Sequence, residues 1–101
     1  MPRYLIERTF VDHFALPHPG EDSQKCQTII ENNRLDGVTW LFTYVVSGCK
    51  KAYCLYEAPS PEAVRSASQH NGLPVDRITE VQVLDPYAFR IEPDEFQATG
   101  M

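Results

Sequence analysis

The stretch that decides the fold reads YCLYEAPSPEAVR and covers residues 53–65. Its first half alternates in the way of a β-strand, and its second half starts a helix. Ser60 is a typical N-cap residue, and Pro61 suits the first helical turn, where its missing amide proton is not needed. We therefore predict a strand over residues 50–57 that leads into a helix, which an Asn-Gly pair at 71–72 can close.

Working outward, residues 38–46 alternate aromatic and small side chains, and a Ser-Gly turn at 47–48 joins them to the strand over 50–57. This pattern is typical of a β-hairpin. The other expected elements are a strand over residues 3–10, a proline-rich loop over 11–20, a helix from Asp22 or Ser23 through about Leu35, and a final strand over 78–84.

The resulting order, β-α-β-β-α-β, predicts an α+β protein of the ferredoxin-like type. In this arrangement two helices cover one face of a four-stranded antiparallel sheet. We expect one domain over residues 1–87 and a tail over 88–101, partly disordered, with loss of order beyond Gln97.

Polar and aromatic residues recur at alternate positions of the four expected strands, and the residues between them are aliphatic. Because side chains alternate between the faces of a strand, we expect the recurring residues on the uncovered face. They are Glu7 and Thr9; Trp40, Phe42 and Tyr44; Cys54 and Tyr56; and Glu80 and Gln82. Soluble monomers seldom expose such an apolar patch, so we predict a homodimer through the open sheet face, in a dimeric α/β-barrel type of association.

Composition excludes several kinds of partner. The 101 residues carry a formal charge of −5 and no basic cluster beyond Lys50-Lys51, so we expect neither nucleic acid nor an anionic membrane surface as a partner. Three cysteines without paired spacing suit reduced thiols. With no apolar run of transmembrane length, the expected location is the cytoplasm.

Four blocks of the sequence carry a family resemblance. They are residues 3–8 (RYLIER), 37–45 (GVTWLFTYV), 53–65 (YCLYEAPSPEAVR) and 71–81 (NGLPVDRITEV). Together they resemble the DUF4242 family of small bacterial proteins, over roughly residues 1–87. The resemblance implies a ferredoxin-like fold, dimers and, as in an actinobacterial type of member, nickel binding. Members often carry a histidine two residues after the hairpin tryptophan, where this chain has Phe42.

Two groups of side chains are candidates for nickel. Nickel accepts imidazole, carboxylate, thiolate and water. The first group, on the expected open face, is Glu7, Cys54 and Glu80, with Tyr44 beside them. The alternative for Cys54 and Tyr44 is simple packing in a dimer interface.

The second group lies in the proline-rich loop and consists of Asp12, His13 and His18. Its two imidazoles are five residues apart, a spacing that matches no named zinc or nickel pattern. The alternative is a solvated loop without a metal.

Two further function classes stay open beside metal binding. Dimeric ferredoxin-like proteins include cofactor-independent oxygenases and isomerases, which work in a cavity between helices and sheet, and a small-ligand carrier would use the same space. Tyr44 and Tyr56 are the residues expected to contact such a ligand. Because no catalytic triad pattern is present, we expect a binding protein without enzymatic activity, with nickel as its first candidate ligand.

Overall fold

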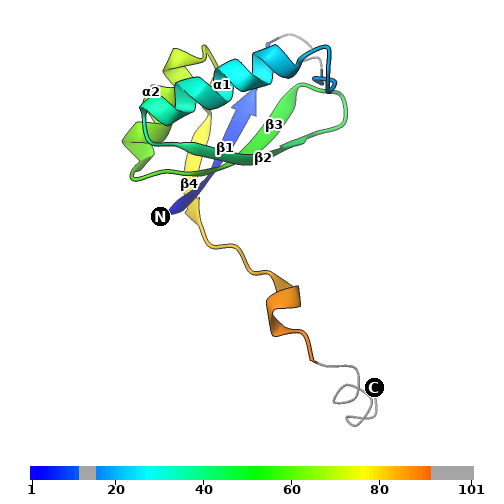
Figure 1. The fold of residues 1–101 in the computed structure, drawn as a ribbon, viewed down its shortest axis with the longest axis vertical. Helices are drawn as coiled ribbons and strands as arrows, with labels where there is room; N and C mark the ends of the chain where they lie inside the picture. The colour runs from blue at the N-terminus through cyan, green and yellow to red at the C-terminus, as the bar shows by residue number, and fades with distance from the viewer. Residues whose placement is uncertain (12–15, 92–101) are drawn as a thin grey trace.

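Four strands and two α-helices alternate along the part of the chain that the computed structural model describes, which is residues 1–11 and 16–91 (Figure 1). In chain order the elements are β1 (Arg3–Thr9), α1 (Ser23–Leu35), β2 (Thr39–Val45), β3 (Lys51–Glu57), α2 (Pro61–His70), β4 (Arg77–Val81) and the 3-10 turn η1 (Pro86–Phe89).

The strands form one sheet in the order β2-β3-β1-β4, and every neighbouring pair is antiparallel. Both helices lie on the same face of this sheet, and the other face has no helix over it (Figure 1). The predicted α+β class, with two helices and a four-stranded antiparallel sheet, is therefore confirmed.

The two helices begin where the sequence predicts, but only one has a side-chain cap. Ser60 Oγ accepts a hydrogen bond from the Ala63 amide at 3.2 Å, and Pro61 follows in the first turn of α2. Asp22 precedes α1 without such a bond. Helix α1 also buries only one of its residues, Asn33. It is therefore the more loosely packed of the two helices.

The core lies between the sheet and α2. Its buried apolar residues come from β1 (Tyr4, Ile6), the loop before β2 (Val38), β3 and the loop after it (Cys54, Tyr56, Ala58), and α2 (Val64, Ala67). Burial of these side chains is the main source of stability for a chain of this length.

The expected alternation along β2 is broken by a bulge. Trp40 pairs with Tyr56 and Phe42 pairs with Leu55, so one extra residue sits between two adjacent partners on β3. A bulge of this kind reverses the face on which the following residues lie. Trp40 packs against the core, whereas Phe42 is 45% exposed on the open face. The prediction that they share a face is wrong.

The register of β1 with its neighbours corrects the predicted open-face positions on β3 and β4. Ile6 pairs directly with Cys54, and Tyr4 pairs with both Tyr56 and Glu80. Directly opposed residues share a face, so these partners lie on the helix side of the sheet. The open-face assignment of Cys54, Tyr56 and Glu80 is therefore wrong, because each is matched to a core residue of β1.

Strand β4 ends at Val81, three residues earlier than expected. Val81 pairs with Arg3, and the residue before Arg3 is a proline, which has no amide proton for another ladder bond. Residues 82–91 then leave the sheet as an arm that projects away from the body (Figure 1). Predicted disorder beyond Gln97 falls outside the described residues.

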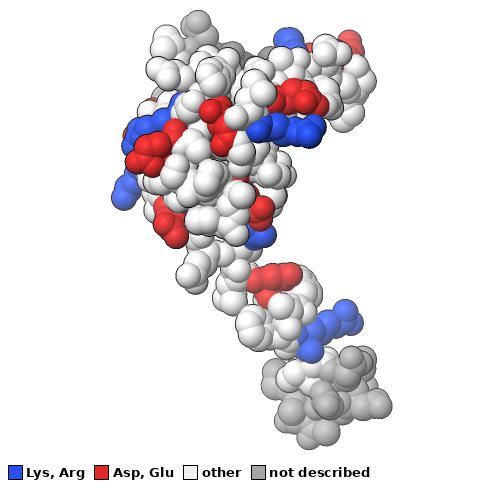
Figure 2. All heavy atoms as spheres, turned by 60° about the vertical axis from the view of Figure 1, so that its left-hand side comes forward, with Lys and Arg blue, Asp and Glu red and all other residues white. Residues whose placement is uncertain are grey.

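The surface shows no field of a single charge in the view of Figure 2, where acidic and basic side chains alternate over the body. In the described part of the chain, neither helix has the length and apolar character needed to cross a membrane.

Candidate functional site

The least expected feature of the interior is Arg8, near the end of β1, whose side chain is only 1% exposed. Its register partner on β3 is Ala52, a small residue that leaves space above it. No carboxylate lies within ion-pair distance of its guanidinium among the described residues. A buried charge is costly unless it is paired or fully hydrogen-bonded, so its contacts matter.

Uncharged acceptors surround the guanidinium instead. Nη1 donates to the Pro74 carbonyl at 2.8 Å, and Nη2 donates to the Tyr56 hydroxyl at 3.1 Å and to Ser68 Oγ at 3.2 Å. The Tyr56 ring lies beneath the same group, with its centroid 5.6 Å from Cζ. Arg8 therefore joins β1 to β3, to α2 and to the loop before β4.

Cys54 completes this cluster through its sulfur. Arg8 Nε donates to Cys54 Sγ at 3.4 Å, and Thr43 Oγ1 donates to the same sulfur at 3.1 Å. Thr43 in turn accepts a hydrogen bond from Trp40 Nε1 at 2.8 Å. The thiol is thus an acceptor at the end of a polar chain that starts on β2.

Burial and charge act in opposite directions on Tyr56. Desolvation raises the pKa of its hydroxyl above the ordinary value of 10.0, and the positive charge of Arg8 offsets part of that rise. The hydroxyl is therefore protonated at neutral pH and remains a neutral partner for Arg8.

A cavity of about 530 Å³ opens beside this cluster, under α1. This volume is within the range of small-molecule sites. The polar or sulfur-bearing lining residues are Arg8, Thr43, Cys54, Tyr56, Asp22, Lys25 and Cys26. The other described lining residues are apolar: Phe10, Leu16, Pro17, Ile29, Trp40, Val45, Ala52 and Leu73.

The structure does not bring the first predicted nickel group together. Glu7 pairs with Tyr53 and Arg77 on the open face, and its Oε1 lies 3.6 Å from Lys51 Nζ. Cys54 is buried on the helix side, and Glu80 lies near Tyr4 on β4. The thickness of the sheet therefore separates Glu7 from the other two. Tyr44 is 62% exposed on the open face, whereas Tyr56 lines the cavity.

The second predicted group is only partly described. Asp12 and His13 lie outside the described residues. His18 is exposed, and its backbone amide donates to Asp22 Oδ2 at 3.0 Å. Within residues 1–11 and 16–91, no three His, Cys, Asp or Glu side chains are placed to hold one metal ion.

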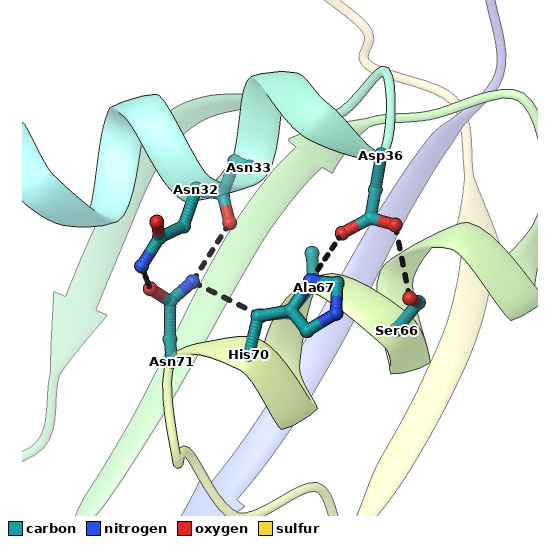
Figure 3. Close-up of polar contacts among 7 residues, drawn as sticks. All are labelled: Asn32, Asn33, Asp36, Ser66, Ala67, His70 and Asn71. Atoms are coloured by element: carbon teal, nitrogen blue, oxygen red, sulfur yellow. Dashed lines mark hydrogen bonds and ion pairs between the residues drawn. The ribbon is translucent and has the colours of Figure 1, made fainter.

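A histidine outside both groups has a carboxylate partner. His70 Nδ1 lies 2.9 Å from Asp36 Oδ2, and the other carboxylate oxygen accepts a hydrogen bond from Ser66 at 2.9 Å (Figure 3). Next to this pair, Asn71 donates to Asn33 at 3.0 Å and accepts from Asn32 at 2.9 Å (Figure 3). The ring of His70, half exposed, is therefore held in a fixed orientation where α1 meets α2.

Sequence reasoning missed both Arg8 and the role of Asp36. The signal for Arg8 was present, because Tyr4, Ile6 and Arg8 alternate and must share a face. The pairing of Asp36 with His70 joins residues 34 positions apart, so it depends on the packing of the helices and has no local signal.

Comparison with known proteins gives likenesses in structure and in family. No curated protein matches the chain. The crystal structure of SCO4226 from Streptomyces coelicolor A3(2) is similar, with a TM-score of 0.65 and 20% sequence identity over 82% of this chain and 99% of that chain. At this identity the likeness concerns the fold alone.

A family model described as nickel responsive protein SCO4226-like matches residues 4–81. The resemblance to DUF4242 proteins is compatible with this match, and the DUF4242 label itself stays a prediction. Because the match covers well over half of the 101 residues, the chain belongs to the SCO4226-like family of nickel responsive proteins.

Proposed function

We propose that this protein binds nickel as a small divalent-metal-binding protein and has no catalytic role. The observation that carries the proposal is membership of the nickel responsive family over residues 4–81. The chemistry of the exposed side chains supports it, because imidazole and carboxylate groups are suitable nickel ligands.

Of the two histidines that the structure describes, His70 has the better-oriented imidazole for this purpose. When its Nδ1 carries the proton and donates to Asp36, the Nε2 atom keeps a free lone pair. Histidines that bind metals usually hold their second nitrogen against a carboxylate or carbonyl in this way, which fixes the tautomer and the ring. The side chain of His70 is 52% exposed, so an ion can reach it from solvent.

The loop histidines are the second part of the proposal. His18 is exposed, and it remains a candidate ligand together with His13 and Asp12. Water or a second copy of the chain would complete the coordination sphere, since nickel accepts six ligands of mixed type. Glu7, Cys54 and Glu80 do not converge, so we do not assign them to one site.

Calorimetric titration of chelator-treated, tag-free protein with nickel tests this proposal, with zinc and cobalt for comparison. His70→Ala should weaken nickel binding about tenfold, and Asp36→Asn should weaken it less, because it only loosens the ring. Cys54→Ala is the matched control and should leave affinity unchanged.

The titration outcomes separate the sites. An effect of His18→Ala without any effect of His70→Ala would move the site to the loop. Absence of heat and of a thermal shift with all three metals would rule out metal binding by this chain.

We also propose a ferredoxin-like homodimer that closes through the open sheet face. The element order and the sheet order β2-β3-β1-β4 support the ferredoxin-like part of this proposal, because the split β-α-β arrangement has the same element order. Phe42 and Tyr44 make an edge-to-face contact on this face, with ring centroids 5.3 Å apart, and both are exposed. The projecting arm adds Leu84, Tyr87 and Phe89, each at least 70% exposed. Such apolar area suits a second copy better than solvent.

Sedimentation of the wild type and of a Phe42→Ser, Tyr44→Ser double variant tests the dimer. The wild type should sediment at twice the 11.5 kDa of one chain, and the variant at 11.5 kDa. A wild type that stays monomeric at high micromolar concentration would contradict the assembly without affecting nickel binding.

The cavity favours a second candidate function, the binding of a small organic molecule between α1 and the sheet. The specific observation is the 530 Å³ space with its largely apolar lining. Binding at this site would not require a metal.

A further inference from the structure

We infer that the cavity under α1 is a site for an apolar monocarboxylate, such as a medium-chain fatty acid, whose carboxylate is held by Arg8. The inference rests on the small-molecule function proposed for the cavity, and it names the chemical class of the ligand. Three observations carry it: Arg8 has no ionic partner among the residues that the structure describes, its guanidinium has hydrogen-bonding capacity left, and most of the other described lining residues are apolar.

The charge balance of the cavity favours an anion. Among the described residues, two basic side chains, Arg8 and Lys25, and one acidic side chain, Asp22, line it. Asp22 lies 3.9 Å from Lys25, and the Lys25 side chain is 82% exposed, so this pair marks the mouth. Within the described lining, Arg8 is therefore left as one net positive charge in a buried position, where the low dielectric strengthens its attraction for an anion.

The guanidinium also has a donor to spare. Its contacts to Cys54, Pro74, Tyr56 and Ser68 use four of the five N–H groups of an arginine. One Nη1 hydrogen has no acceptor among the described residues. A single charge with one spare donor matches a monoanion. A phosphate dianion would need more donors than the lining offers.

The remaining walls define the body of the ligand. Leu16, Ile29, Val45 and Leu73 present aliphatic surface, and Phe10 and Trp40 present aromatic rings. A hydrocarbon chain or ring would be removed from water there, and that burial would supply most of the affinity. The ligand is thus a molecule with one charged end and an apolar remainder.

The cavity exists because of the side chains that α1 and β3 present to it. Helix α1 buries only Asn33, and β3 places Ala52 opposite Arg8. A helix with larger inward residues, or a larger side chain at position 52, would fill the same volume. Protein interiors are normally packed to high density, so an unfilled space of this size beside a charge points to a ligand.

Trp40 gives a direct optical test, because it is the single tryptophan of the chain and lines the cavity. Chelator-treated protein without added metal is titrated with sodium octanoate, 1-octanol and octyl phosphate, and Trp40 fluorescence is followed. Octanoate should bind with a dissociation constant of about 10–100 µM, and octanol about tenfold more weakly. Octyl phosphate should bind more weakly than octanoate.

A matched pair of variants tests the anchor. Arg8→Gln should remove the preference for octanoate over octanol. Arg3→Gln, on the same strand but on the open face, should leave it unchanged. If Arg8→Gln does not fold by circular dichroism, Ala52→Leu decides, since it keeps Arg8 and narrows the cavity. That variant should lose octanoate binding while remaining folded.

The outcomes distinguish the inference from the function on which it rests. If octanol binds as tightly as octanoate, or octyl phosphate binds more tightly, the cavity is a ligand site but the carboxylate assignment is wrong. If no probe changes Trp40 fluorescence, both are wrong. Unchanged octanoate preference in folded Arg8→Gln, or unchanged octanoate binding in Ala52→Leu, overturns the inference.

Discussion

The two faces of β1 carry the same residue type in opposite surroundings. Arg3, on the open face, is partly exposed, and its Nε lies 3.1 Å from Glu57 Oε2 in an ion pair. Arg8, on the helix face, is buried and contacts only uncharged groups among the described residues. Solvent and a carboxylate satisfy the first guanidinium, whereas the second depends on the fold and leaves a charge beside a cavity.

This difference indicates that the two faces of the sheet suit different kinds of contact. The open face carries exposed aromatic rings and ordinary ion pairs, which suit contact with a second copy. The helix face carries the core together with an unusual polar cluster, which suits recognition of something small. Substitutions at matched positions on the two faces can therefore break or sharpen the comparison.

The largest difference in lost stability should appear between substitutions at two adjacent aliphatic residues of β1. Ile6 is fully buried on the helix face, whereas Leu5 is half-buried on the open face. Ile6→Ala should lower the free energy of unfolding by about 2–5 kcal/mol, because it removes buried methyl groups and leaves a void. Leu5→Ala should lower it by about 1 kcal/mol. Urea denaturation measures both, and equal losses would contradict the assignment of the core to the helix face.

The second largest difference in lost stability should appear between substitutions of the two arginines of β1. Arg8→Ala removes the common donor of four acceptors and should lower the free energy of unfolding by about 1–3 kcal/mol. Arg3→Ala breaks an ion pair that is partly exposed and should cost at most about 0.5 kcal/mol. Thermal unfolding monitored by circular dichroism compares them. A loss in Arg3→Ala as large as that in Arg8→Ala would show that the buried cluster has no special weight.

Alkaline pH should lower the free energy of unfolding through Tyr56, which lies on the helix face. Burial raises the pKa of this hydroxyl in the folded protein, so the unfolded chain loses the proton first as the pH rises. The stabilising contribution is therefore complete below pH 10.0, the ordinary tyrosine value, and is lost as the pH rises through the folded pKa.

Tyr56→Phe isolates this effect. At neutral pH the variant should have a free energy of unfolding about 1 kcal/mol lower than the wild type, because it lacks the hydrogen bond to Arg8. Above pH 10 its free energy of unfolding should decrease less steeply than that of the wild type. Urea unfolding at a series of pH values measures both slopes. Identical alkaline slopes in the variant and the wild type would assign the sensitivity to other groups.

The smallest effect on the stability of a single subunit should come from the open face. Tyr44 is 62% exposed, so Tyr44→Ser should change the free energy of unfolding by less than about 0.5 kcal/mol at dilute protein concentration. The same substitution should reduce self-association at higher concentration. A large loss of stability in dilute protein would indicate that this ring packs within its own chain.

Much of the fold could be predicted from local signals. The Ser-Pro start of α2, the turn between β2 and β3, and the start of α1 all depend on residues close in sequence, and the structure confirms each of them. The assignment of side chains to the two faces failed on β2, on β3 and, for Glu80, on β4. A bulge shifts the alternation by one residue, and both faces of β3 carry apolar side chains, so its pattern does not indicate which face is core.

The sequence by itself determined the order of strands and helices, because capping residues, turns and alternation act over a few positions. It also contained the alternation that places Arg8 with Ile6. Only the tertiary structure decided that Cys54 and Tyr56 face the helices, that Asp36 meets His70, and that a cavity remains beside Arg8. These features arise from contacts between residues far apart in the chain, where strand register and helix packing set the distances.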